Sequence, residues 1–172
     1  MLFFKPNPEK LAKKRDVVGL LRLLASSDRD LRYKASYYLG QSDLKQTAIP
    51  HLIRVLSDHS VSADAARLLG RHGATEAVDS LVSALNSSDQ QTRREAAAAL
   101  SKMHSPRIPY KDIQPLLDAA LGSELDIRRD AIRAIFHCRD PRAFEAFCAN
   151  ITDSTVGWYA VTGLRELRDP RQ

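Results

Sequence analysis

The stretch "SSDRDLRYKASYYLG" at residues 26–40 returns in similar form as "SSDQQTRREAAAALS" at residues 87–101. Both stretches open with Ser-Ser-Asp, place an alanine seven residues after the aspartate, and place a leucine four residues after the alanine. A sequence pattern that recurs at a fixed distance is the signature of a repeat architecture. The rest of the chain therefore has to be compared with this pattern.

Five copies of the pattern cover the chain. Their central alanines are 30, 31, 35 and 29 residues apart: Ala35, Ala65, Ala96, Ala131 and Ala160. An acidic residue stands seven positions before each alanine: Asp28, Asp58, Asp89, Glu124 and Asp153. Upstream of each acid lies a second apolar stripe with helical period, as in Val17, Leu20, Leu21 and Leu24. Each unit is thus predicted to be two short helices.

The residues between these stripes favour helices over strands. Ser, Asp, Asn and Gly fall at the boundaries, whereas the interiors are rich in Ala and Leu. We expect the aspartate or a serine of the two Ser-Ser-Asp turns, at 26–28 and 87–89, to cap the second helices of their units. Gly40 and Gly70 are expected to end second helices in the left-handed conformation. No alternating strand pattern appears, so the fold class is all-α.

A pair of such helices cannot bury its apolar face alone, so neighbouring pairs must stack on one another. The units resemble HEAT repeats, in the short form first associated with phycobilisome lyases. The matching pattern is complete in the first unit: Asp28, Leu31, Arg32, Ala35, Leu39 and Gly40. The resemblance spans roughly residues 16–172. It implies a right-handed α-solenoid of about five two-helix units behind an N-terminal capping helix.

We divide the chain accordingly. Residues 1–15 form a capping segment, in which Phe3 and Phe4 are expected to cover the first unit, and residues 16–172 form the solenoid. Its units are expected at about 16–43, 44–73, 74–111, 112–140 and 141–169, with 170–172 opening a truncated or absent sixth unit. The fifth unit offers a series of apolar residues that would favour association with a partner or a second copy: Val156, Trp158, Tyr159, Val161 and Leu164. The alternative is that a trimmed boundary left only a few disordered residues.

Composition agrees with a cytoplasmic protein without a membrane partner. The N-terminal apolar run Leu2-Phe3-Phe4 is too short for a signal peptide, and no stretch could span a bilayer. Cys138 and Cys148 have neither metal-site nor redox-motif spacing, so both are expected to be small core residues. Of 26 basic and 21 acidic residues, five and one precede residue 16, so the solenoid itself is nearly neutral.

The distribution of charge is more informative than its sum. In HEAT proteins the second helices line the concave surface, which here would present the residues two before, two after and six after each central alanine. Six of these fifteen positions are Arg or Lys, whereas 26 such residues in 172 would give about two. The candidate binding residues are Tyr33, Tyr37, Arg67, Arg71, Arg94, Lys102, Arg129, Arg133, His137 and Trp158.

A concave cationic stripe attracts an anionic partner. We expect an acidic protein or peptide partner, with tyrosine and tryptophan as flat anchors. Nucleic acid is the alternative, since phosphates would meet the arginines and bases could stack on the rings. A third interpretation is that the arginines pair with nearby acids, such as Asp64 with Arg67 and Asp130 with Arg133, and only solubilise the face.

A second set of arginines is predicted to be structural. In HEAT-like proteins, an arginine just after the start of the second helix commonly bonds the turn acid of an adjacent repeat. The resemblance implies such a ladder here from Arg32, Arg93 and Arg128 to the turn acids Asp28, Asp58, Asp89 and Glu124. Ser62 and Gly157 stand where units two and five would have the arginine, so the ladder should be interrupted there.

No catalytic arrangement emerges from the sequence. The five histidines are scattered and form no His-Glu dyad of the kind that di-iron relatives need for metal ligation. No phosphate loop, nucleophile elbow or Cys-His pair occurs. We therefore predict a binding scaffold without metal or cofactor. A bilin lyase-type or chaperone-like subunit is the remaining alternative, because the resemblance to lyases lies in the repeats themselves.

Overall fold

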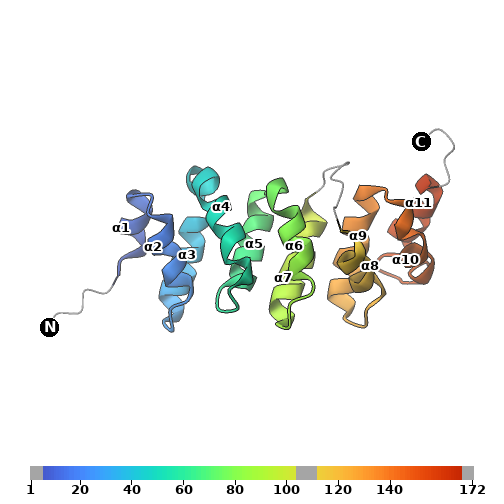
Figure 1. Cartoon of the computed structure of the whole chain (residues 1–172), viewed down its shortest axis with the longest axis horizontal. Coiled ribbons are helices and arrows are strands. Elements are labelled where there is room, and N and C mark those ends of the chain that lie inside the picture. The colour runs from blue at the N-terminus through green and yellow to red at the C-terminus, as the bar shows by residue number, and fades with distance from the viewer. Residues whose placement is uncertain (1–5, 104–111, 168–172) are drawn as a thin grey trace.

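The structure is a computed structural model that describes residues 6–103 and 112–167. Over these residues the chain is helical apart from turns, and α-helices follow one another in a row (Figure 1). The first helices of the pairs, with the single helix that precedes them, are α1 (Pro8–Lys13), α2 (Val17–Leu24), α4 (Lys45–Arg54), α6 (Val78–Ala84), α8 (Gln114–Leu121) and α10 (Phe144–Ala149). The second helices are α3 (Arg29–Leu39), α5 (Ser62–His72), α7 (Gln90–Lys102), α9 (Leu125–Cys138) and α11 (Gly157–Leu167). Short 3-10 turns occupy Ser42–Leu44, Val55–Ser57, Thr75–Ala77 and Pro141–Ala143.

The pairs stack side by side into an α-solenoid, as the repeats predict. Each second helix packs against its own first helix and against the second helix of the next pair, most extensively α5 against α7 and α7 against α9. The first helices α2, α4, α6, α8 and α10 form the other layer of the row (Figure 1). Helix α1 packs on α2 and α3 at the start of the row, where a capping helix was expected.

The helix starts that the sequence predicts are confirmed. Asp28 accepts the backbone N–H of Asp30 at 2.9 Å, and Asp89 accepts that of Thr92 at 2.8 Å. Asp16 accepts the N–H of Gly19 at 2.8 Å and so caps α2. These carboxylates satisfy backbone donors that have no partner inside the helix, and they sit at the positive end of the helix dipole.

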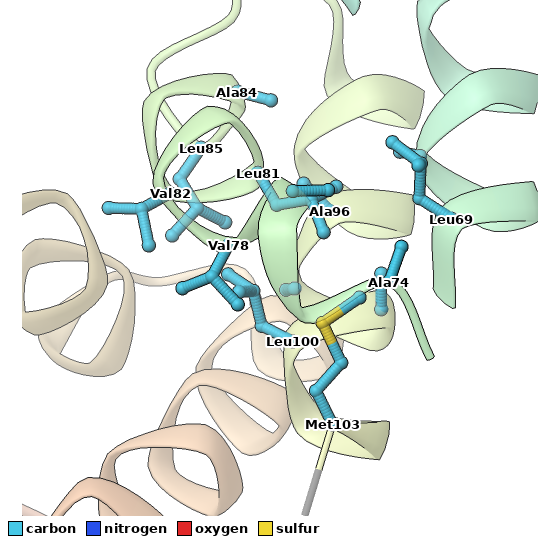
Figure 2. Close-up of a cluster of buried hydrophobic side chains, with 14 of the residues drawn as sticks. Leu69, Ala74, Val78, Leu81, Val82, Ala84, Leu85, Ala96, Leu100 and Met103 are labelled. Atoms are coloured by element: carbon cyan, nitrogen blue, oxygen red, sulfur yellow. The ribbon is translucent and has the colours of Figure 1, made fainter. Parts of the chain in front are cut away.

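The core runs between the two layers through the whole row. The five central alanines are completely buried, and so are the leucines of the first layer such as Leu20, Leu52 and Leu81. Figure 2 shows the part of the core where α5, α6 and α7 meet, with Leu81 of α6 directed at Ala96 of α7. The small alanines let the second helices approach one another closely, and the larger side chains fill the space between the layers.

The prediction for Gly40 and Gly70 is wrong. Gly40 follows α3 with φ −82°, and Gly70 lies inside α5, which ends at the left-handed Gly73 with φ +58°. Both glycines serve close packing instead. A Cβ at Gly70 would stand 2.8 Å from the Cα and Cβ of Ala99, and one at Gly40 would stand 2.6 Å from the guanidinium of Arg71.

The cysteines differ from each other. Cys138 is partly buried, donates its thiol to the carbonyl of Ile135, and has its pKa raised to about 11 by burial. Cys148 is exposed, so its assignment to the core is wrong. Ala146 and Phe147 lie on the face of α10 that packs on the core. The next residue, Cys148, therefore lies on the outer face.

Some expectations fall outside the described residues, among them the placement of Phe3 and Phe4 and the connector at 169–171. The exact borders of the five units stay a prediction. Within residues 6–103 and 112–167, no helix combines the length and apolarity needed to cross a membrane.

We predict that Gly70→Ala destabilises the protein by about 1–3 kcal/mol, because the new methyl group would collide with the backbone of α7. In an exposed helix the same change is stabilising by up to about 1 kcal/mol, because alanine has the higher helix propensity. The sign of the change in the free energy of unfolding therefore distinguishes the steric effect from helix propensity. Urea denaturation followed by circular dichroism measures the effect. As a control, Gln46→Ala on the exposed side of α4 should change stability by less than about 0.5 kcal/mol. A stabilising Gly70→Ala would contradict the close approach of α5 and α7.

Candidate functional site

The candidate binding residues lie along one strip of the second helices, made up of the positions two before, two after and six after each central alanine. The strip lies on the side of these helices that does not face the core. Tyr33, Tyr37 and Trp158 expose 72%, 51% and 67% of their surfaces. Arg71, Arg94 and Lys102 are exposed, whereas Arg67, Arg129, Arg133 and His137 are half-buried. The strip does not behave as one site, because its arginines have different partners in different units.

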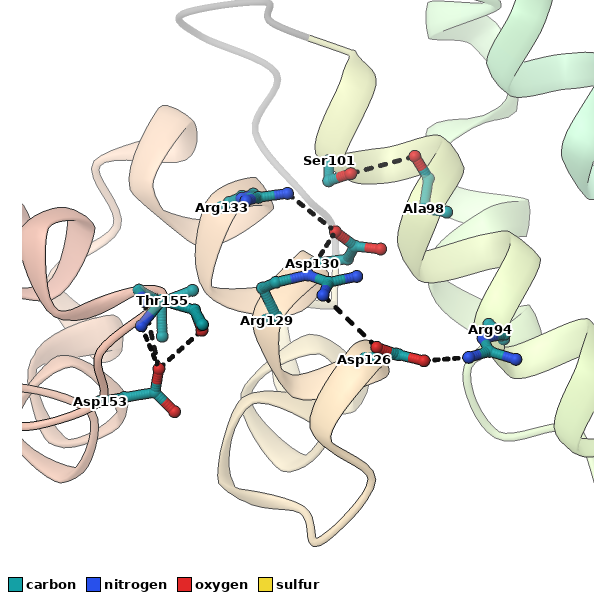
Figure 3. Close-up of polar contacts among 10 residues, drawn as sticks. Arg94, Ala98, Ser101, Asp126, Arg129, Asp130, Arg133, Asp153 and Thr155 are labelled. Carbon is teal, nitrogen blue, oxygen red and sulfur yellow. Dashed lines mark hydrogen bonds and ion pairs between the residues drawn. The ribbon is translucent and has the colours of Figure 1, made fainter.

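In the third and fourth units, the arginines of the strip are paired with acids (Figure 3). Arg94 of α7 bonds Asp126 at the start of α9, and Arg129 approaches the same carboxylate at 3.4 Å. Arg133 contacts Asp130 at 3.4 Å. The Arg94 guanidinium holds the pKa of Asp126 below its usual value. These three arginines and two aspartates form one chain of alternating charge, so little net charge remains there.

The first and second units differ, because a groove lies between α3 and α5. It has a volume of about 560 Å³ and four arginines in its lining. The lining residues are Arg29, Arg32, Tyr33, Ser36, Tyr37, Asp64, Arg67 and Arg71. One carboxylate therefore faces four guanidinium groups. The groove is strongly cationic and carries the two exposed tyrosines on its α3 side.

Each arginine of the groove is held differently. Arg67 pairs with Asp64 and also donates to the Ser36 hydroxyl at 3.0 Å, which holds its guanidinium between α3 and α5. Arg32 donates to the carbonyls of Ser26 and Ser27 at 2.7 and 3.0 Å, bonds that leave its charge uncompensated. Arg29 and Arg71 have no ion pair among the described residues. A ligand carboxylate would therefore meet guanidinium groups that are already positioned or unengaged.

The groove exists because α3 and α5 approach each other less closely than the later second helices do. Near the end of α3, the His72 ring of α5 bonds the Leu39 carbonyl through Nε2 at 2.8 Å. The Arg71 guanidinium lies against Gly40. Between these contacts and the turn that precedes α3, the polar side chains of Ser36, Asp64 and Arg67 lie in the interface of the two helices. Sequence analysis did not identify Arg29 and Ser36 as groove residues. Ser36 could have been recognised as unusual, because the equivalent residues of the other units are apolar: Ala66, Ala97, Ile132 and Val161.

The structural arginines make only part of the expected ladder. Arg93 bonds Glu124 of the next unit at 2.8 Å, and Arg128 approaches Asp153 at 3.5 Å. Arg32 instead bonds its own turn, while Asp58 accepts the Ser60 hydroxyl at 2.7 Å. Asp28 serves as a helix cap rather than as a partner of an arginine.

A hydroxyl chain stands where the second unit lacks the ladder arginine. The Ser62 and Thr92 hydroxyls are 2.7 Å apart in the buried interface of α5 and α7, and Thr92 donates to Asp89 at 2.6 Å. The turn acid of the third unit is thus linked to the second unit through neutral groups. Because Thr92 donates its proton to Asp89, the buried Ser62 hydroxyl donates to Thr92 and depends on it as an acceptor.

The last unit gathers aromatic side chains. The Trp158 and Tyr159 rings lie 5.9 and 5.5 Å from Phe136 of α9, and the Arg133 guanidinium stands over Tyr159 at 5.7 Å. His137 contacts the Phe136 ring at 5.2 Å. Trp158 and Val161 remain exposed on α11, and the self-association expected from such a surface stays a prediction. The described residues contain no group of three or more His, Cys, Asp or Glu side chains that could hold a metal ion.

Comparison with known proteins agrees with this architecture. The family described as HEAT repeats matches residues 57–135. The phycocyanobilin lyase subunit alpha of Nostoc sp. (strain PCC 7120) is 32% identical over 114 residues, which are 60% of this chain. The middle of the chain, residues 57–135, thus matches HEAT repeats. The match spans 41% of the length of the Nostoc protein, so this chain corresponds to less than half of that relative.

Solved structures show the same fold at low sequence identity. A designed armadillo repeat protein in complex with the peptide (KR)4 has a TM-score of 0.69 at 16% identity, covering 94% of this chain and 85% of that one. The complex of CpcE and CpcF of phycocyanin lyase from Nostoc sp. PCC7120 has a TM-score of 0.65 at 21% identity, covering 99% and 69%. These likenesses show that the chain has the fold of an α-solenoid.

The contact between His72 and Leu39 predicts a pH dependence. Burial, with smaller contributions from the charges of Lys45 and Arg71, lowers the pKa of His72 from its ordinary value. Between the ordinary value of about 6.5 and the lower folded value, the unfolded chain binds more protons at this site. The free energy of unfolding should therefore fall as the pH falls below about 6.5.

His72→Gln should flatten this dependence while retaining an N–H donor for the Leu39 carbonyl. Urea denaturation of both proteins at a series of pH values measures it. His59→Gln, in an exposed turn, controls for the removal of a histidine as such. Parallel profiles of the wild type and His72→Gln would contradict the assigned role of His72.

Proposed function

We propose that the protein is a binding scaffold that holds an acidic protein or peptide segment on its concave face, in the groove between α3 and α5. One observation supports this proposal above the others: four arginines and two exposed tyrosines line this groove, against a single carboxylate. The other arginines of the strip are tied into ion pairs, so the groove is the place where an incoming acid finds the strongest attraction.

The residue types suit this ligand. A guanidinium presents planar donors that match a carboxylate, and such charge-assisted hydrogen bonds are stronger than neutral ones. Tyrosine rings provide rigid contact area that is apolar on the face and polar at the hydroxyl. The concave position between two helices concentrates the field of the arginines and attracts an acidic partner from a distance.

The comparisons support a role in binding without specifying the partner. The designed armadillo repeat protein holds a basic peptide, which illustrates that an α-solenoid of this kind can hold a peptide. In the present chain the groove is cationic, so an acidic rather than a basic peptide is complementary to it. Nucleic acid is the competing anion, and the experiment below separates it from an acidic peptide.

A lyase-type subunit is the second candidate. The 32% identity with the phycocyanobilin lyase subunit alpha favours it, although the match covers 41% of that protein. Incubation of the purified chain with phycocyanobilin, followed by absorbance spectra, tests this candidate. A shifted chromophore spectrum that depends on Arg67 and Arg71 would favour the lyase-type role over the scaffold.

We predict that a fluorescein-labelled peptide of repeated glutamates binds the full chain, and that Arg67→Gln combined with Arg71→Gln weakens this binding at least about tenfold. Fluorescence anisotropy at several salt concentrations measures the affinities, which should decrease as salt rises. The paired change Arg22→Gln and Arg54→Gln, on exposed positions of α2 and α4, removes the same charge elsewhere and should have less than about a twofold effect.

A single-stranded oligonucleotide and a neutral glycine-serine peptide complete the comparison. Equal weakening by both double variants would mean that only overall charge matters, which contradicts a localised groove. Tighter binding of the oligonucleotide than of the acidic peptide would replace the proposed partner by nucleic acid. Circular dichroism spectra of each variant establish that the changes leave the fold intact.

A further inference from the structure

The two walls of the groove differ in chemistry. Tyr33 and Tyr37 lie one helical turn apart on α3, and both expose their rings. Arg67 and Arg71 lie one turn apart on α5. Residues four apart on a helix have their Cβ atoms about 5–6 Å from each other. The groove therefore offers a row of two aromatic rings along one side and a row of two guanidinium groups along the other.

The two rows are displaced along the groove. The Arg67 guanidinium contacts Ser36, and the Arg71 guanidinium lies against Gly40, beyond the end of α3. The arginine row is thus shifted toward the helix C-termini relative to the tyrosine row. The Tyr37 ring is ordered by an edge contact with Tyr38, whose ring centroid is 5.4 Å away. Tyr37, Arg67 and Arg71 thus already contact the protein before a ligand arrives.

The space between the walls limits the conformation of a bound segment. The Arg67 side chain of α5 alone bridges the groove to the Ser36 hydroxyl of α3, at 3.0 Å. An added helix, with a diameter of about 10–12 Å including side chains, is too wide to enter between walls that one side chain bridges. A single extended segment is much thinner, with about 4.8 Å between neighbouring strands of a sheet. A peptide in this groove is therefore extended and lies along the helices.

We infer that the groove binds an extended peptide segment in which acidic and apolar residues alternate. This inference rests on the proposed function and specifies its partner. In an extended chain, successive side chains point to opposite sides. A segment that lies between the two walls thus directs every second side chain to the tyrosines and the others to the arginines. Alternation places each chemical type on the matching wall, whereas a run of acids would force carboxylates against the rings.

The spacing along the segment also matches. Side chains on the same side of an extended chain repeat at about 6.6–6.8 Å, close to the 5–6 Å between positions four apart on a helix. Neighbouring side chains on opposite sides are displaced by about 3.3 Å, in the same sense as the displacement of the arginine row. The long, flexible arginine side chains accommodate the difference that remains.

The test compares two capped peptides of the same composition, labelled with fluorescein at the same end. One alternates glutamate and leucine, and the other has all its glutamates before its leucines. We expect the full chain to bind the alternating peptide at least about tenfold more tightly. Tyr33→Ser combined with Tyr37→Ser should abolish this preference. Leu125→Ser, another exposed apolar residue at the start of α9, should leave it unchanged.

The outcomes distinguish a failure of the alternating pattern from a failure of the proposed acidic-partner scaffold. Equal affinity for the two peptides, with loss of binding in the double arginine variant, would overturn the alternation and leave the acidic-partner scaffold in place. No binding of either peptide or of polyglutamate would overturn both. A preference for the alternating peptide that survives the tyrosine changes would overturn the assignment of the apolar side chains to the α3 wall. Equal circular dichroism spectra and thermal melts ensure that all variants are folded.

Discussion

The close approach of the second helices is the constraint on which the molecule depends. Ala65, Ala96 and Ala131 are completely buried, and Gly70 leaves no room for a side chain against Ala99. Helices that touch in this way place charged residues along the strip that faces neither the core nor a neighbouring second helix, or near their starts, where Arg93 and Arg128 reach the turn acids of the next unit. The same small residues that allow the stack therefore also collect the arginines and aromatic residues on one surface.

The interface of α3 and α5 is the exception to this close packing. Ser36 stands where the later units place Ala66, Ala97 and Ile132, and its hydroxyl accepts a hydrogen bond from Arg67. A guanidinium is larger than a methyl group, so its presence in the interface keeps the helices apart over part of their length. His72 closes the other end through the Leu39 carbonyl. The groove is thus associated with Ser36, a polar residue at a position that is apolar in the other units, and with the arginine that it binds.

Sequence reasoning reached the fold because the decisive signals are local and repeated. A spacing of alanines, acids and leucines indicates paired helices, and Asp28 and Asp89 cap them as predicted. The site was less accessible, because the pairing of an arginine depends on residues of the next unit. Asp126 lies 32 residues beyond Arg94, and only the stacking register brings the two together. The roles of Gly40, Gly70 and Cys148 were mispredicted for the same reason, since each depends on what packs against the residue.

Ion pairing makes the arginines of the second helices differ from one another, although they occupy equivalent positions in the sequence. A guanidinium that already bonds a carboxylate has to give up that bond before it binds an external acid, although exposed pairs of this kind contribute only about 0–1 kcal/mol each. The larger effect is on the field, because Asp126 and Asp130 cancel most of the charge of three arginines over a few ångströms. Within this strip, the uncompensated positive charge is therefore greatest at the groove between α3 and α5, beside the tyrosines. Charge and flat contact area coincide there, and that coincidence makes one part of a repetitive molecule distinct from the rest.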